Sequence, residues 1–158
     1  MSPATMSLLL EYGFAYDSSL MADDYTPYRV RVGDILTPDV TKLGKTTRLI
    51  EMPVSWSLDD FPHFEPVRLD GNPQAGLRRT DDVLANLVDD FRFMAQELED
   101  GVMTYTFHPL VIGRGHRMLM LARLIDELRS LGATFDRLDH AAAEFARSPA
   151  HEAIAEDW

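Results

Sequence analysis

The clearest indication of the fold is the stretch Thr104-Tyr105-Thr106-Phe107-His108-Pro109. Its β-branched and aromatic residues favour an extended strand, which we expect over residues 102–107. Pro109 ends that strand, because proline has no backbone N–H to donate to a neighbouring strand. His108 therefore stands at the carboxyl end of the predicted strand. In α/β proteins the side chains at such ends face the active site.

Amphipathic segments lie on both sides of this strand. The apolar side chains of residues 80–99 recur at helical spacing, and Asp81 and Asp82 stand in the first turn, where a helix dipole favours anions. Residues 116–130 repeat the helical pattern as far as the stop signal Gly132. Strand and helix therefore alternate, which is typical of βα units in a mostly parallel sheet or barrel.

The same alternation continues toward both ends of the chain. We expect further helices over residues 2–13 and 140–147 and short strands over residues 15–17, 48–54 and 134–138, with an additional hairpin strand over residues 28–32. Residues 59–79 contain several prolines and glycines and predict a long irregular loop. Loops of that length in a compact domain are often functional.

Composition excludes several classes of function. The 158 residues include 26 acidic and 15 basic side chains, a net charge of −11, which repels phosphate backbones and anionic membranes. We therefore expect no nucleic-acid and no membrane partner. The absence of cysteine excludes disulfides, thiolate nucleophiles and cysteine-bound zinc. The sequence has no targeting segment and no apolar run long enough to span a bilayer, so a cytoplasmic location is the default expectation.

Two strand ends carry candidate chemistry, and each has a structural alternative. His108 can exchange a proton near neutral pH, or it can be a hydrogen-bonded structural histidine. Residues 51–62 lead from a strand into a loop with Trp56, Asp59 and Asp60. A tryptophan beside carboxylates is a common wall for sugars or planar amides. Alternatively, the tryptophan belongs to the core and an aspartate caps its own turn.

A glycine-rich segment follows His108. Residues 111–117 look like a phosphate-binding loop but lack the Gly-Lys-Ser/Thr ending, so we expect no nucleotide site. The segment can instead be an active-site loop that leads into a helix, or Arg114 and Arg117 can bind nearby carboxylates. No pair of histidines has metal-ligand spacing with a carboxylate, and no serine lies in a Gly-x-Ser-x-Gly turn. The sequence thus predicts neither a metal site in this chain nor a Ser-His-Asp triad.

Taken in order, several segments resemble the polysaccharide deacetylase family with its NodB-homology domain. The resemblance extends from residue 2 to about residue 147 and is closest to a branch with peptidoglycan deacetylase-like, allantoinase-like and cyclic imide hydrolase-like proteins. The segments that carry it are residues 16–21, Asp24, residues 27–28, 51–60, 106–109 and 113–118. The family fold is a distorted (β/α) barrel with the active site at the carboxyl ends of its strands.

The resemblance implies a hydrolase of carbon-nitrogen, non-peptide bonds that acts on N-acetylated sugars or small cyclic amides. It implies that His108 is the general acid that protonates the leaving amine. Trp56 corresponds to the aromatic wall of the substrate groove, and Asp59 and Asp60 correspond to the acidic loop beside it. Arg114 lies in the Gly-Arg loop after the histidine, where we expect it to support substrate binding.

Some segments that the family places before residue 2 have no counterpart in the sequence: an acidic strand end, a His-x-x-x-His segment and an Arg-x-Pro segment. We therefore expect an α/β fold that forms the C-terminal half of the barrel, with residues 1–150 as a partial domain and residues 151–158 as a tail. We expect no cofactor to bind to this chain alone, and a zinc-type divalent metal only in a longer parent.

Two alternatives to sugar deacetylation stay open at this point. The first is ring opening of a small cyclic amide, which some members of the family perform without metal. The second is an inactive fragment or assembly module. Because half a barrel leaves sheet edges and a core face uncovered, we expect a homo-oligomer or pairing with a complementary chain.

Overall fold

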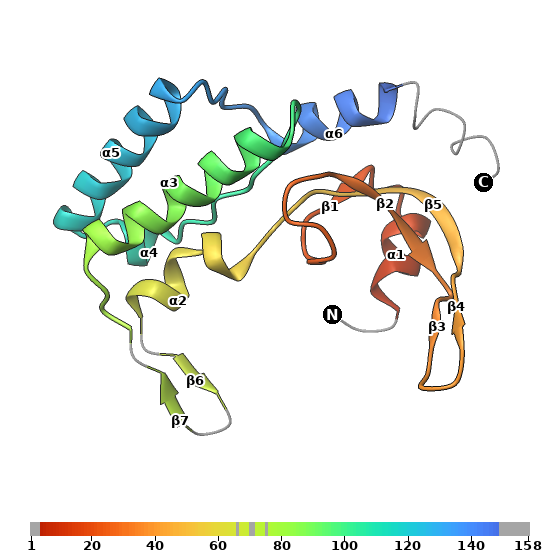
Figure 1. Ribbon diagram of the computed structural model, residues 1–158. Helices are drawn as coiled ribbons and strands as arrows, with labels where there is room; N and C mark the ends of the chain where they lie inside the picture. Colours follow the sequence, from red (N-terminus) through yellow and green to blue (C-terminus); the bar gives the residue numbers. More distant parts are fainter. Residues whose placement is uncertain (1–3, 66, 70–71, 75, 149–158) are drawn as a thin grey trace. The chain divides into compact units, whose positions relative to one another are not determined.

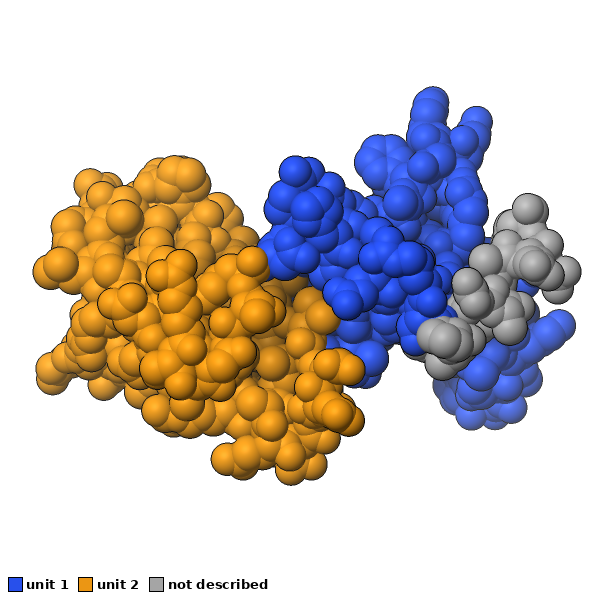
Figure 2. Space-filling model, turned by 90° about the horizontal axis from the view of Figure 1, so that it is seen from above, with its two compact units in different colours: residues 1–53, 136–158 blue, residues 54–135 orange. Residues whose placement is uncertain are grey.

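The computed structural model describes residues 4–65, 67–69, 72–74 and 76–148, so the tail predicted for residues 151–158 lies outside the described residues (Figure 1). The chain forms two compact units. Unit 1 comprises Met1–Pro53 and Asp136–Trp158, and unit 2 comprises Val54–Phe135 (Figure 2). No described helix is long and apolar enough to cross a membrane.

Unit 1 is built around a small mixed sheet with the strand order β1-β5-β2. Strand β1 runs parallel to β5, and β2 runs antiparallel to it, with an irregularity in the register between Arg29 and Arg31. A second hairpin, β3–β4, lies between β2 and β5 in the sequence. The elements of this unit are α1 (Thr5–Glu11), β1 (Tyr16–Asp17), β2 (Tyr28–Val32), β3 (Ile35–Leu36), β4 (Thr41–Lys42), β5 (Lys45–Glu51) and α6 (Leu138–Arg147).

The central strand β5 begins three residues earlier than the sequence predicts, because Lys45 pairs with Val32 of β2. Thr47 and Leu49 are fully buried within it, and the Thr47 hydroxyl donates a 2.8 Å hydrogen bond to the backbone carbonyl of Val30. This bond gives the buried hydroxyl proton an acceptor, and the same oxygen accepts a 3.2 Å hydrogen bond from the backbone N–H of Leu49. The hairpin strand predicted for residues 28–32 is confirmed as β2.

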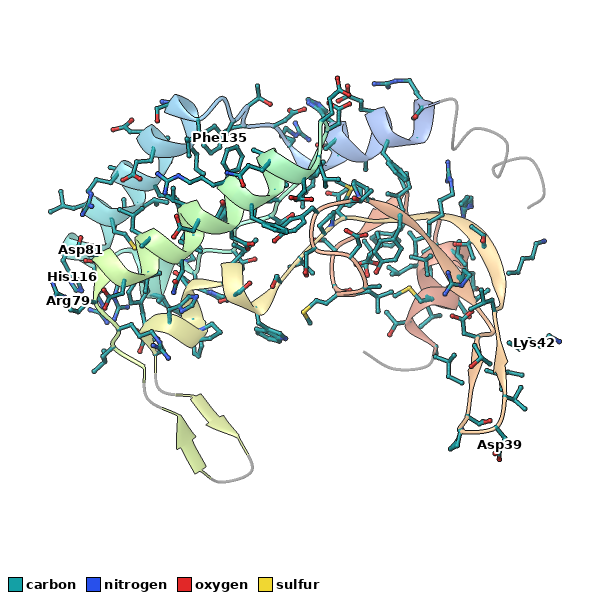
Figure 3. All side chains as sticks on the ribbon, in the orientation of Figure 1. Asp39, Lys42, Arg79, Asp81, His116 and Phe135 are labelled. Carbon is teal, nitrogen blue, oxygen red and sulfur yellow. The ribbon has the colours of Figure 1, made fainter. Side chains whose placement is uncertain are left out.

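Unit 2 is mostly helical. Its two long helices, α3 and α5, run side by side and bury their apolar faces against each other (Figure 1). Asp81, near the start of α3 and close to Arg79 (Figure 3), forms a 2.7 Å ion pair with Arg123 of α5. The elements of this unit are η1 (Trp56–Leu58), α2 (Asp60–Phe64), β6 (Val67–Leu69), β7 (Asn72–Gln74), α3 (Thr80–Glu97), α4 (Pro109–Ile112) and α5 (Gly115–Ser130).

The strand predicted over residues 102–107 is wrong. The segment makes a single parallel bridge, between Thr106 and Asp59. Its neighbour offers one extended residue only, because η1 ends at Leu58 immediately before Asp59 and α2 begins at Asp60 immediately after it. A strand needs a partner that stays extended for several residues, so the propensity of residues 102–107 does not produce a ladder here.

Two further predictions from the sequence are also wrong. Residues 134–137 form no strand, because they are exposed and have no buried face that would favour pairing with a neighbour. The helix α6 starts at Leu138, the last residue of the predicted strand. Residues 59–79 are not one irregular loop, since they contain the helix α2 and the hairpin β6–β7. The α/β class is confirmed, but the described residues hold three small sheets and no closed barrel.

Candidate active site

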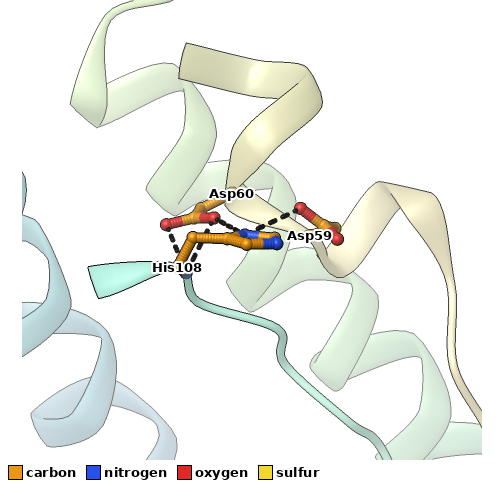
Figure 4. Close-up of side chains that lie close together, drawn as sticks. All are labelled: Asp59, Asp60 and His108. Carbon is orange, nitrogen blue, oxygen red and sulfur yellow. Dashed lines mark hydrogen bonds and ion pairs between the residues drawn. The ribbon is translucent and has the colours of Figure 1, made fainter. Parts of the chain in front are cut away.

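The site is centred on a direct contact between Asp60 and His108 (Figure 4). Asp60 is the first residue of α2 and is only 2% exposed, while His108 immediately precedes α4. The ring atom Nδ1 of His108 lies 2.7 Å from Oδ1 of Asp60. The backbone N–H of His108 also donates to the same carboxylate, at 3.1 Å to Oδ1 and 3.2 Å to Oδ2. One buried carboxylate therefore holds both the backbone and the ring of His108.

The single β-bridge explains why these residues meet. The backbone N–H of Thr106 donates to the carbonyl of Leu58 at 3.0 Å, and the N–H of Asp60 donates to the carbonyl of Thr106 at 3.0 Å. These two bonds hold the segment before α2 beside the segment before α4, so that Asp60 and His108 come together. Pro109 then starts α4, where its missing N–H costs nothing, so the chain turns away directly after His108.

The carboxylate beside the ring changes the acidity of His108. The hydrogen bond to Asp60 raises the pKa of His108 above its ordinary value of 6.5, partial desolvation opposes this, and the negative charge of Asp59 adds to the increase. The ring packs edge-on against Phe61, with centroids 5.5 Å apart. Its side chain is 40% exposed, and no described residue is hydrogen-bonded to Nε2. The pair can therefore hold an imidazolium that offers a proton from Nε2.

The structure separates the roles of the two predicted acidic residues. Asp59 caps α2, because its Oδ1 accepts a 2.8 Å hydrogen bond from the backbone N–H of Phe61, and it lies 3.6 Å from Nδ1 of His108. Asp60 is the hydrogen-bonding partner of the histidine, and its expected place beside the substrate stays a prediction. The sequence analysis missed this pairing because the two residues are 48 positions apart. Their common place after predicted strands was the one available signal.

Trp56 and the two arginines lie in different environments. Trp56, in η1, is 64% exposed, so the alternative of a core tryptophan is wrong. Arg114 is exposed just before α5 and forms no ion pair with the described part of the chain. Arg117 is buried and pairs with Glu65 at 2.9 Å. Binding of a carboxylate was predicted for both arginines and is seen only for Arg117.

Asp59, Asp60 and His108 are also of the residue types that bind divalent metals, and their ligand atoms lie within 4.8 Å of one another. The sequence analysis predicted no such group. The arrangement is that of a hydrogen bond, since 2.7 Å separates Nδ1 from Oδ1 and two ligands on one zinc ion stand roughly 3.3 Å apart. The Asp59 oxygen nearest the ring caps a helix.

Relatives of this chain are found among known proteins both by sequence and by fold. No family model matches the sequence. The sequence is 34% identical over 138 residues to a peptidoglycan deacetylase of Helicobacter pylori, over 80% of this chain and 47% of that protein. A Mycobacterium smegmatis crystal structure described as a polysaccharide deacetylase matches 91% of the chain with a TM-score of 0.70 and 28% identity. The chain belongs to the polysaccharide deacetylase family.

Two further structures share the fold of this polysaccharide deacetylase-family chain. The Puue allantoinase matches 94% of it with a TM-score of 0.69 and 24% identity. A Pseudomonas aeruginosa PAO1 protein described as a polysaccharide deacetylase also matches 94%, with a TM-score of 0.71 and 23% identity. The chain spans about half the length of the relatives it matches, 44–47% of each.

Proposed function

We propose that this chain supplies the proton-donating side of a hydrolytic site that cleaves carbon-nitrogen, non-peptide bonds, with N-acetylated sugars as substrates. The observation that carries the proposal is the His108–Asp60 pair, a partly exposed imidazole hydrogen-bonded to a buried carboxylate. The names of the Helicobacter pylori relative and the Mycobacterium smegmatis structure support the choice of an N-acetylated sugar.

The reaction requires a proton at the departing nitrogen. Water adds to the amide carbonyl and gives up a proton to solvent or to a basic group, the carbon-nitrogen bond breaks, and the products are acetate and a free amine. His108 donates its Nε2 proton to that nitrogen as the bond breaks, because an amide anion is too basic to leave unprotonated. The Asp60 carboxylate accepts a hydrogen bond from Nδ1–H, which keeps that proton on the ring and stabilises the imidazolium before transfer.

A substrate panel tests this choice of reaction. The native polypeptide that carries this chain is incubated with N-acetylglucosamine oligomers and, separately, with a hydantoin-type cyclic amide. We expect release of acetate together with a primary amine from the sugar. Ring opening of the cyclic amide without turnover of the sugar would support the second candidate function, ring-opening hydrolysis. The chain shares its fold with the Puue allantoinase. No turnover of either substrate would overturn the hydrolase proposal and favour an inactive module.

Trp56 is proposed to pack against the sugar through its exposed ring. Replacing Trp56 with alanine should raise KM about 2- to 10-fold through loss of ring stacking and leave kcat nearly unchanged. The free energy of unfolding should change by less than about 0.5 kcal/mol, since the side chain is mostly exposed. Leu119→Ala, at an exposed apolar position of α5, is the matched control. An unchanged KM in W56A would reject the binding role.

The chain is also proposed to self-associate through unit 1. Strands β1 and β2 are the outer strands of its main sheet, and large side chains such as Tyr12, Phe14 and Leu36 are exposed there. Open edges and exposed apolar side chains favour pairing with another chain. We expect light scattering of the purified chain to give a dimer or larger species. A monomer that persists as concentration rises would contradict self-association, and a stable complex with a second polypeptide would indicate a complementary chain instead.

A further inference from the structure

We infer that Arg117 is a positioning residue, which holds the helices carrying Asp60 and His108 at the spacing their contact requires. The inference deepens the proposed function, because it concerns the geometry of the same acid pair. Arg117 belongs to α5 and does not contact His108. It acts on the far ends of the two short helices that begin at the acid pair.

Arg117 binds both short helices at once. Its Nη1 donates to the carboxylate of Glu65 and to the backbone carbonyl of Val111, each at 2.9 Å. Its Nη2 donates to the backbone carbonyl of Phe64 at 3.3 Å, and the guanidinium lies over the Phe64 ring at 4.6 Å from the centroid. Phe64 is the last residue of α2, Glu65 follows it directly, and Val111 belongs to α4. One side chain, 4% exposed, thus joins the carboxyl ends of both elements.

Neither short helix can hold its own orientation. Helix α2 has 5 residues and α4 has 4, and helices of one turn are marginal in water without tertiary contacts. The last carbonyl groups of a helix accept no hydrogen bond from an N–H of the same helix. A cation close to these groups is therefore favourable. Arg117 supplies that cation to both, in the planar fork geometry that lysine lacks.

The anchor for these contacts is rigid. Helix α5 has 16 residues and buries Met120, Leu124 and Leu128 on the side that packs against α3. Arg117 stands near its start, so the guanidinium position is set by a long, well-packed helix rather than by a loop. The two short helices are therefore tied at one end by Arg117 and at the other by Asp60 and His108. Weakening the contacts of Arg117 should therefore lengthen or break the hydrogen bond between Asp60 and His108.

NMR of the imidazole groups tests this without any enzymatic assay. The His108 signals are identified by their absence in an H108Q variant. In Arg117→Lys we expect the pKa of His108 to fall toward its ordinary value and the hydrogen-bonded Nδ1 proton to exchange faster with water, while far-UV circular dichroism keeps its helical intensity. Arg123→Lys, the same change at an exposed position of the same helix, should leave both signals as in the native protein.

Glu65→Ala provides a second test if the lysine variant fails to fold. It removes one acceptor from Arg117 at the surface side and keeps the buried cation bound to the carbonyls of Phe64 and Val111. We expect the same changes in His108 at smaller amplitude. Folded variants with a native His108 pKa and Nδ1 exchange rate would overturn the inference. Because the readout is the histidine itself, absence of hydrolysis would reject the proposed function and leave this result standing.

Discussion

Replacing His108 with glutamine should lower kcat for amide hydrolysis by about 10²- to 10⁴-fold, the usual contribution of a general acid. Glutamine has a similar reach and can still bond to Asp60, but it has no proton to release near neutral pH. The loss should appear in kcat and kcat/KM to the same degree, because the proton is needed in the transition state rather than for binding. The measurement is acetate release at saturating substrate by the native polypeptide.

A matched control separates this effect from a general loss of histidine. His140 also lies beside an aspartate, with Nδ1 at 3.1 Å from Oδ1 of Asp136, but both side chains are more than half exposed on the surface. His140→Gln should therefore keep native activity. If H108Q retained a near-native rate while remaining folded, His108 would lose its role as the acid, and the proposed function would lose its main support.

Replacing Asp60 with asparagine should lower the pKa of His108 in the folded protein. The Asp60 hydrogen bond is the largest of the causes that raise this pKa, and an amide carries no charge to stabilise the imidazolium. Activity that depends on a protonated acid falls as pH rises through its pKa. The alkaline limb of the rate profile should therefore move to lower pH in D60N, and NMR titration of His108 should move with it.

The same shift predicts a change in how stability depends on pH. The folded pKa of His108 lies above its unfolded value, so protonated His108 adds stability that is fully present below about pH 6.5 and lost as pH rises through the raised folded pKa. In D60N this contribution should shrink. Urea unfolding at pH 5.5 and at pH 9, chosen as roughly below and above this range, measures the difference.

Asp136→Asn is the control for D60N, because it removes an aspartate beside the exposed His140 and keeps the acid pair intact. It should leave the His108 titration and the alkaline limb of activity where they are in the native protein. An unchanged His108 pKa in folded D60N would mean that the buried carboxylate does not hold the ring in solution.

Much of the helical structure could be predicted from the sequence. The predicted bounds of α3 and α5, residues 80–99 and 116–130, differ from the observed ones by at most two residues, because their apolar side chains repeat over four or more turns. The strand predicted over residues 102–107 failed for a reason that lies outside the segment itself. Strand propensity is local, but a ladder needs a neighbour, and residues 102–107 found extended backbone only at Asp59.

For the site, the sequence by itself determined the chemical types: a histidine before Pro109, a pair of aspartates after a predicted strand, and a tryptophan near them. Only the tertiary structure decided their division of labour. Asp60 binds His108, Asp59 caps α2, and Arg117 ties the two helices together. The contacts of Asp60 with His108 and of Arg117 with Glu65 join residues about fifty positions apart. Backbone hydrogen bonds at Thr106 set which of the two neighbouring aspartates binds the ring, and no local sequence pattern contains that choice.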